Sequence, residues 1–190
     1  MIAALYGDQP PPGEWTTDDL DRLPEDGRRY ELLDGNLLRS RSPTRLHQSI
    51  TVRLMAALEE SCTAELDVTQ GVQVRLSRSR AFIPDGLVTE FRAAARNPSH
   101  YRPNEVMLVV EVVSESSRSI DRVLKPALYA EAAIPYFWRI ETEAGIVVHA
   151  HELDPSRRSY VEKARMTDGI LLPEPWEIDI PLSRISPRSH

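Results

Sequence analysis

Cysteine is almost absent from this sequence, which contains one, Cys62, among 190 residues. One thiol cannot form a disulfide within the chain or build a thiolate metal site, so a bound metal would need oxygen or imidazole ligands, which points to hard cations. Long apolar runs are absent too, since no stretch approaches the roughly 18 to 20 apolar residues of a membrane span. Asp8 follows the short apolar start too soon for a secretory signal. We therefore expect a cytoplasmic protein.

The composition is that of an ordinary folded domain, with 41% hydrophobic and 27% charged residues. A chain of this length buries a core large enough to hold an active site. Residues 7–13 are rich in proline and glycine and cannot form a regular element. We therefore expect a flexible lead-in over residues 1–14 and a single domain over residues 15–190.

The charge is unevenly distributed. The net charge of −6 argues against a nucleic-acid partner, but residues 1–27 alone hold seven acids against one arginine. Residues 28–53 and residues 71–102 each hold six arginines against two acids. These two stretches could contact phosphates through planar, bidentate donors, or they could be an ordinary solvated surface in an arginine-rich chain.

Two short elements are predicted near the start of the chain. Thr16 or Thr17 caps a short helix that ends before Pro24. Further on, the Asp34–Gly35 dipeptide separates two apolar runs and supplies the positive φ angles of a tight turn. We therefore predict a β-hairpin over residues 30–38.

Helical spacing of apolar residues predicts two longer helices, over residues 43–61 and about 119–132. The stripe expected to be buried in the second helix consists of Ile120, Val123, Leu124, Ala127 and Leu128. Pro126 should kink or restart this helix, because proline lacks the amide donor and disfavours helical geometry in the residue before it.

Runs of apolar or alternating residues predict strands. Residues 106–113 are apolar on both faces and are expected at the centre of a sheet. The other predicted strands cover residues 68–76, 82–89, 136–140 and 146–151, with weaker candidates at 158–164 and 178–182, and residues 91–104 are typical of a polar loop. The core order of helix, three strands, helix and strand predicts a mixed α/β fold with helices covering a sheet.

Glu111 is the main anomaly in these patterns, because it lies inside the apolar central strand. An isolated buried carboxylate costs several kcal/mol, so a partner is implied unless the side chain turns to solvent at the strand end or pairs with an arginine. Asp85 follows Pro84 in another apolar segment, which is also ordinary turn chemistry. Two carboxylates on neighbouring strands would repel each other unless a divalent ion were shared between them, and oxygen ligands suit Mg²⁺ or Mn²⁺.

Lys125 is one of two lysines in the sequence and lies about one helical turn beyond Asp121. Its ammonium could stabilise the charge of a phosphate that is being cleaved, or orient the attacking water. The alternative is a surface ion pair between Asp121 and Lys125, since the two are spaced as neighbours on a helix.

These residues add up to a resemblance that extends from about Trp15 to Ile140. The segments that carry it are Tyr30-Glu-Leu-Leu-Asp-Gly35, His47-Gln48, Pro84-Asp85, Glu111-Val-Val-Ser114, then Asp121, Lys125 and Tyr129, and finally Pro135-Tyr-Phe-Trp138. In this order and spacing the sequence resembles the Uma-two family of restriction endonucleases, a large bacterial branch of the PD-(D/E)xK nuclease superfamily. The resemblance implies a restriction-endonuclease-like fold, with a central mixed sheet, an αβββαβ core and flanking helices, and it implies DNA cleavage that depends on Mg²⁺ or Mn²⁺.

The resemblance also implies roles for particular residues. Asp85 matches the aspartate of the PD motif and Glu111 matches the second carboxylate, and both would bind the metal. The lysine of the superfamily usually stands two residues after that carboxylate, where this sequence has Val113, so Lys125 on the following helix takes its place. Tyr129 and Trp138 are assigned to packing around the site.

Two further residues are implied with alternatives left open. Glu31 matches an additional acidic residue near the metal, and its alternative is a hairpin carboxylate paired with Arg28 or Arg29. His47 matches a position at the start of the first long helix, where it would carry a proton or contact a phosphate. A partly exposed histidine covering the core is the alternative.

The sequence therefore favours a Mg²⁺-dependent endonuclease acting on DNA, and a homodimer is expected because double-strand cleavage needs two sites facing two strands. A second hypothesis is a catalytically inactive module of the same fold that binds DNA or a protein partner. A third is metal-assisted hydrolysis of a small phosphoester.

Overall fold

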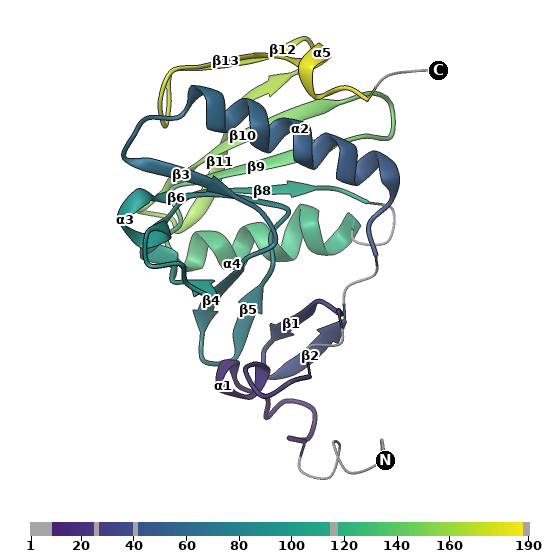
Figure 1. The fold of residues 1–190 in the computed structure, drawn as a ribbon, viewed down its shortest axis with the longest axis vertical. Helices are drawn as coiled ribbons and strands as arrows, with labels where there is room; N and C mark the ends of the chain where they lie inside the picture. Colours follow the sequence, from purple (N-terminus) through teal and green to yellow (C-terminus); the bar gives the residue numbers. More distant parts are fainter. Residues whose placement is uncertain (1–8, 25–26, 40–41, 115–117, 188–190) are drawn as a thin grey trace.

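The computed structural model describes residues 9–24, 27–39, 42–114 and 118–187 (Figure 1). Residues 1–8 of the predicted lead-in lie outside this description. Among the described residues, no helix combines the length and the apolar character needed to cross a membrane.

The predicted hairpin is confirmed. Strands β1 (Tyr30–Leu33) and β2 (Asn36–Arg39) pair antiparallel, and the turn residues Asp34 and Gly35 have φ angles of 48° and 74°. Gly35 is also in close contact with another segment, because its carbonyl accepts hydrogen bonds from the amides of Gly13 (2.9 Å) and Trp15 (3.1 Å). The short helix α1 (Thr17–Leu20) precedes the hairpin and has a capping box between Thr16 and Asp19.

The hairpin belongs to a five-stranded sheet with the order β2-β1-β5-β4-β7. Its other strands are β4 (Gln73–Ser77), β5 (Arg80–Phe82) and the two-residue β7 (His100–Tyr101). In Figure 1 this sheet lies in the lower half of the molecule, below the larger sheet.

The larger sheet has six strands in the order β11-β10-β9-β8-β6-β3. They are β3 (Leu66–Thr69), β6 (Gly86–Glu90), β8 (Val106–Val112), β9 (Tyr136–Glu141), β10 (Val147–Asp154) and β11 (Ser159–Met166). The β8–β9 pair is parallel and the other pairs are antiparallel, so the sheet is mixed, as predicted. The predicted central strand, β8, is buried along its length except at Met107.

Helices cover both faces of the six-stranded sheet (Figure 1). On one face, α2 (Arg45–Ser61) packs in the same hydrophobic cluster as β12 (Gly169–Leu172), β13 (Ile178–Pro181) and α5 (Leu182–Ile185). On the other face, α4 (Lys125–Glu131) packs with the five-stranded sheet and with the second side of β8. The succession α2, β3, β6, β8, α4, β9 is the expected αβββαβ core, with β4 and β5 inserted between β3 and β6.

Two predicted strands are each divided between the two sheets, and predicting them as single strands was wrong. The run 68–76 separates into β3 and β4 at Gly71, whose φ of 73° turns the chain. The run 82–89 separates into β5 and β6, because the segment Ile83–Asp85 carries the chain from one sheet to the other and Pro84 offers no amide for a ladder.

The remaining corrections concern local structure. The segment 91–104 is not simply a loop, since it contains α3 (Phe91–Ala94), β7 and the start of a 3₁₀ turn (Pro103–Glu105). The second predicted helix begins as a π-helical segment, η3 (Ile120–Leu124), and becomes α-helical at Lys125, where Pro126 occupies the first turn. Neither β12 nor α5 was predicted.

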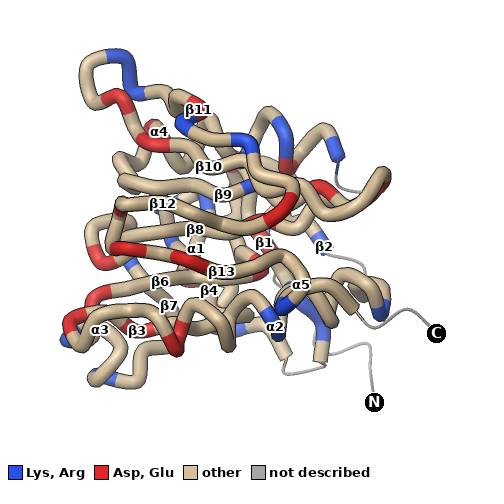
Figure 2. Tube along the Cα trace, turned by 90° about the horizontal axis from the view of Figure 1, so that it is seen from above, with Lys and Arg blue, Asp and Glu red and all other residues tan. Residues whose placement is uncertain are grey.

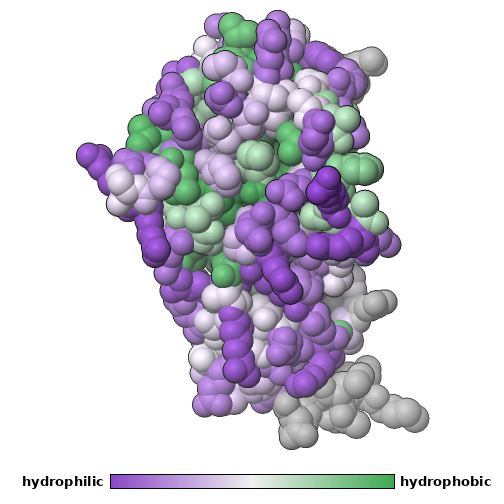
Figure 3. Space-filling model, turned by 90° about the vertical axis from the view of Figure 1, so that its left-hand side faces the viewer, coloured by the Kyte–Doolittle hydropathy of each residue, from purple (hydrophilic) through white to green (hydrophobic). Residues whose placement is uncertain are grey.

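The surface is charged and mixed. Lysines and arginines are interspersed with aspartates and glutamates over the molecule (Figure 2). On the side that carries α3, hydrophobic residues show between polar ones in the upper part, whereas the lower part is mainly hydrophilic (Figure 3).

Candidate active site

A cavity of about 510 Å³ opens where the two sheets meet. It is lined by the hairpin, the start of α2, the Ile83–Asp85 crossover, the end of β8 and the η3–α4 helix. All of the residues predicted from the sequence as site residues line it: Glu31, His47, Asp85, Glu111 and Lys125. The fold therefore brings together side chains that are up to 94 residues apart in the chain, since 125 − 31 = 94.

Glu111 lies on β8, and its side chain is on the sheet face that α4 covers. It is 2% exposed, so it does not turn to solvent. Lys125 Nζ lies 3.0 Å from Oε1 and 3.2 Å from Oε2, and the Tyr129 hydroxyl donates to Oε1 at 2.7 Å. The implied partner is therefore an ammonium and a phenol.

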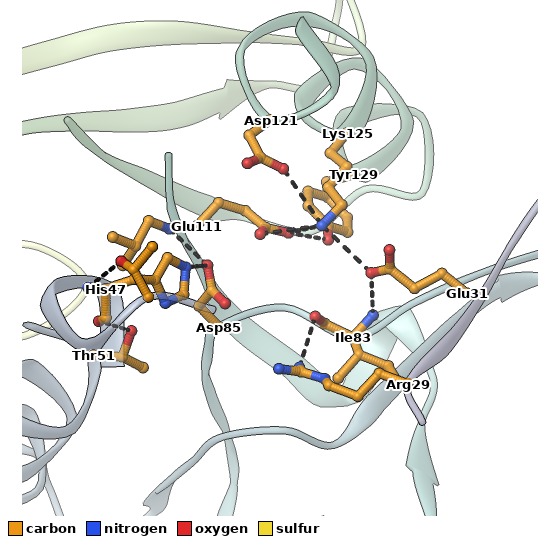
Figure 4. A network of polar contacts seen from close by, with 12 residues as sticks. Arg29, Glu31, His47, Thr51, Ile83, Asp85, Glu111, Asp121, Lys125 and Tyr129 are labelled. Atoms are coloured by element: carbon orange, nitrogen blue, oxygen red, sulfur yellow. Dashed lines mark hydrogen bonds and ion pairs between the residues drawn. The ribbon is translucent and has the colours of Figure 1, made fainter. Parts of the chain in front are cut away.

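Lys125 is the cation at the centre of this group, with a side chain that is 7% exposed. Besides Glu111, its Nζ lies 3.4 Å from Glu31 Oε1 and 3.5 Å from Asp121 Oδ1. Figure 4 shows these carboxylates directed toward the end of the lysine from different sides. The ammonium holds together side chains from β1, β8 and η3, which come from both sheets and from the helix.

The ion pair between Asp121 and Lys125 exists, but its interpretation as a surface pair was wrong, because Asp121 is 3% exposed. The predicted buried stripe of this helix is correspondingly shifted: Val123 is 70% exposed and Ala127 is exposed. The helix turns Asp121 and Lys125 inward because Glu111 and Glu31 lie opposite them. A prediction based on the spacing of apolar residues alone cannot detect a helix that turns charged side chains toward the interior.

Burial and charge set the protonation of these groups. Burial raises the pKa of Glu111 well above its usual value, and only Lys125 opposes this effect among the neighbouring charges. Burial by itself lowers the pKa of Lys125, but the surrounding carboxylates outweigh burial and the net pKa is raised. Burial also raises the pKa of Tyr129, and Glu111 adds to that shift. The lysine therefore stays charged and the tyrosine stays protonated at neutral pH.

Asp85 forms a second group with His47, beside Glu111 (Figure 4). Its Oδ2 accepts from the Val112 amide at 2.8 Å and lies 3.1 Å from His47 Nε2. Within the described part of the chain, Oδ1 of Asp85 makes no hydrogen bond. The β8 backbone thus fixes Asp85 next to Glu111, because Val112 directly follows Glu111.

His47 occupies the first turn of α2. Its amide donates to Thr44 Oγ1 at 3.3 Å and its carbonyl accepts from Thr51 Oγ1 at 3.0 Å, so the backbone is held on both sides. With Nε2 next to the Asp85 carboxylate, the proton of a neutral ring lies on Nε2 and Nδ1 carries the lone pair. Nδ1 is buried and has no hydrogen-bond partner in the residues that the structure covers.

Glu31 reaches the site from the hairpin and is 8% exposed. Its Oε1 accepts from the Ile83 amide at 2.9 Å, and Arg29 Nη2 donates to the Ile83 carbonyl at 3.2 Å. Strand β1 therefore holds the crossover segment that carries Asp85.

The two aromatic residues assigned to packing are both buried. Trp138 belongs to the core between α2 and the six-stranded sheet. Tyr129 is fully buried as well, but its hydroxyl bond to Glu111 was not predicted.

The donor atoms in the cavity are of the type that a hard cation uses. Asp85 and Glu111 offer carboxylate oxygens, and Mg²⁺ is typically bound through one or two carboxylates together with waters and substrate oxygens. No described cluster of three or more histidine, cysteine, aspartate or glutamate side chains is arranged around a common metal position. Asp85 and Glu111 line the same cavity, and their oxygen donors are of the kind that would fit a hard cation with two protein ligands and further ligands from solvent and substrate.

Comparisons with known proteins agree with this architecture. A protein-family model named Uma2 and described as "Putative restriction endonuclease" matches residues 17–181. Among solved structures, a "putative nuclease belonging to DUF820" from Anabaena variabilis superposes with a TM-score of 0.68 at 13% sequence identity, over 90% of this chain and 96% of that one. No curated protein matches the chain.

The likeness to the Anabaena protein shows the fold, which is restriction-endonuclease-like. The family match spans most of the chain and includes each predicted site residue. The protein is a member of the Uma2 family of putative restriction endonucleases.

Proposed function

We propose that this protein is a divalent-metal-dependent endonuclease that hydrolyses phosphodiester bonds in DNA. The observation that carries the proposal is the grouping of Asp85, Glu111 and Lys125 at one open cavity. Family membership and the likeness to a structure described as a nuclease support it.

In this proposal Asp85 and Glu111 hold Mg²⁺ or Mn²⁺, which when bound polarises a phosphodiester and lowers the pKa of a coordinated water. Lys125 stabilises negative charge on the phosphate, because its ammonium is fixed beside Glu111. His47 carries a proton or contacts a phosphate, while the contact between Nε2 and Asp85 holds the ring in place. Glu31 positions Lys125 and the crossover segment.

The cost of the buried charges favours catalysis over simple binding. Removing several ionised groups from water costs several kcal/mol for each ion, and a module that only bound DNA would need no such cluster beneath its surface. A carboxylate in a cavity whose pKa is raised by burial, as that of Glu111 is, is typical of active sites.

A homodimer and a cytoplasmic location belong with this proposal. Two copies would present two sites to the two strands of a duplex, and the cytoplasm is the expected location of a protein that acts on DNA.

A plasmid-nicking assay with Mg²⁺, Mn²⁺ and a chelator tests the proposal. Asp85→Asn and Glu111→Gln should each lower the cleavage rate by about 100-fold or more. They should also weaken Mn²⁺ binding in calorimetry, because each removes one anionic ligand. Glu177→Gln, at an exposed position away from the cavity, is the matched control and should behave as the wild type.

Other outcomes identify the alternatives. DNA binding without cleavage under any metal would favour the inactive module. Faster turnover of nucleotides or model diesters than of DNA would favour a small-phosphoester hydrolase.

A further inference from the structure

Two arginines of the hairpin line the cavity without an acidic partner. Arg39 ends β2 and is exposed, and Arg29 precedes β1 and donates to the Ile83 carbonyl. In the described part of the chain, neither guanidinium forms an ion pair with a carboxylate. Other arginines of the same sheet do form such pairs, for example Arg75 with Asp21 and Arg80 with Asp34.

The cavity continues past the reactive groups. A second cavity of about 430 Å³ shares Thr44, His47 and Ser114 with the first. Beyond these residues it is lined by uncharged side chains such as Leu46 and by one ion pair, between Arg118 and Glu143. The two cavities therefore adjoin at Thr44, His47 and Ser114, and together they are called the cleft.

Charge distinguishes the two ends of this cleft. The floor near Lys125 carries several carboxylates, which repel a polyanion. Unpaired guanidinium groups at the hairpin end offset that repulsion and match the geometry of phosphate oxygens. The second end, with few free charges, suits sugars and bases better than phosphates.

We propose that Arg29 and Arg39 bind phosphates of a DNA strand on one side of the cleaved bond, and that the strand continues past His47 into the second cavity. This proposal rests on the proposed function, since it names how the substrate of the same site is held. A strand that passes through the cleft in both directions is cut at internal bonds and needs no free end.

The contribution of Arg39 is tested by DNA binding without turnover. Fluorescence anisotropy with a labelled duplex in chelator, at several salt concentrations, should show about tenfold weaker binding for Arg39→Ala at low salt. The slope of log affinity against log salt should also become less steep by roughly 0.9, which corresponds to the loss of one phosphate contact. Arg39→Lys should recover part of the affinity, because it keeps the charge and loses the planar fork.

Arg92→Ala is the matched control, since Arg92 is an exposed arginine on α3 that lines neither cavity. It should bind DNA as the wild type does. The Arg39 side chain makes no hydrogen bond or ion pair with the described residues, and equal melting temperatures would show that both variants are folded. Equal affinities and salt slopes for Arg39→Ala and Arg92→Ala would overturn the role of Arg39, and so would a wild type that does not bind DNA.

The open cleft is tested by competition. A covalently closed plasmid and the same plasmid after linearisation should displace the labelled duplex equally well. A strong preference for the linear form would contradict a cleft open at both ends. Because both assays measure binding, they remain decisive if no metal supports cleavage: the Arg39 effect would then stand while the nuclease proposal failed.

Discussion

Lys125 shows how much of this site depends on one buried cation. Its ammonium lies within 3.5 Å of carboxylate oxygens of Glu31, Glu111 and Asp121. Replacing it by methionine keeps the volume of the side chain but leaves these acids buried together without the ammonium. Breaking a buried pair by removing one partner typically costs about 3–5 kcal/mol, so Lys125→Met should lower the free energy of unfolding in urea by about that amount.

The second lysine of the chain provides the control for this prediction. Lys163 pairs with Glu152 at 3.1 Å, but both side chains are about half exposed. Exposed ion pairs contribute about 0–1 kcal/mol, so Lys163→Met should change stability by no more than that. If Lys125→Met were as stable as Lys163→Met, the buried carboxylates would not depend on the ammonium.

At the residue scale, the sequence was most informative where a charge breaks an apolar pattern. Glu111 stands out in β8 because burial of a lone carboxylate is costly, and the need for a partner could be predicted without knowing which group supplies it. Asp121 and Tyr129 were not identified as members of the site. Each has an ordinary alternative in a sequence, a surface ion pair for the aspartate and aromatic packing for the tyrosine. Only the position of Glu111 opposite the helix shows that Asp121 and Tyr129 belong to the site.

The hairpin turn is the element that supports one wall of the site. A Cβ atom on Gly35 would lie 2.2 Å from the Gly13 carbonyl oxygen, in addition to the strain of a φ of 74°. Gly35→Ala should therefore destabilise the protein by more than the roughly 1–3 kcal/mol of backbone strain alone, as measured by thermal or urea unfolding. It should also weaken DNA binding, because β1 and β2 carry Glu31 and Arg39.

Gly145→Ala separates the two causes. Gly145 has a φ of 99°, but a Cβ there would meet nothing within 4 Å. This variant should show the cost of the backbone conformation only, with no change in DNA binding. Equal losses of stability in both variants would mean that the contact with Gly13 is relieved by a small shift of the chain.

At the element scale, local patterns predicted most helices and strands but not their assignment to sheets. The hairpin was predictable because its Asp34–Gly35 turn is a local signal. The division of 68–76 between β3 and β4, by contrast, depends on which strands lie beside each half. The switch from π-helical to α-helical geometry at Lys125 could be anticipated only as a kink or restart from Pro126. Pairings between distant segments are the part that one sequence does not specify locally.

The stability of the whole molecule should depend on pH through groups in both sheets. In the six-stranded sheet, burial lowers the pKa of His151, and Arg139 adds to the shift although Glu162 opposes it. A histidine with a lowered pKa in the folded state stabilises the fold above its unfolded pKa, about 6.5, and this contribution is lost as the pH falls. Beside the five-stranded sheet, a hydrogen bond from Arg75 on β4 lowers the pKa of Asp21 at the end of α1, so that contribution is lost at lower pH, below about 4.

Urea unfolding at pH 7.5, 5.5 and 3.5 measures the two contributions separately. Between pH 7.5 and 5.5 the wild type should lose more stability than His151→Asn, because the asparagine cannot take up the proton that opposes folding. Between pH 5.5 and 3.5 Asp21→Asn should lose less stability than the wild type, because the asparagine has no carboxylate to protonate. Since the side chain of Asp21 is 56% exposed, its contribution to the pH dependence of stability is smaller than that of a buried ion pair. Equal losses of stability by the wild type and His151→Asn between pH 7.5 and 5.5 would show that His151 does not couple protonation to folding. The loss in that interval would then have to come from another group whose pKa is lowered by burial, such as His100.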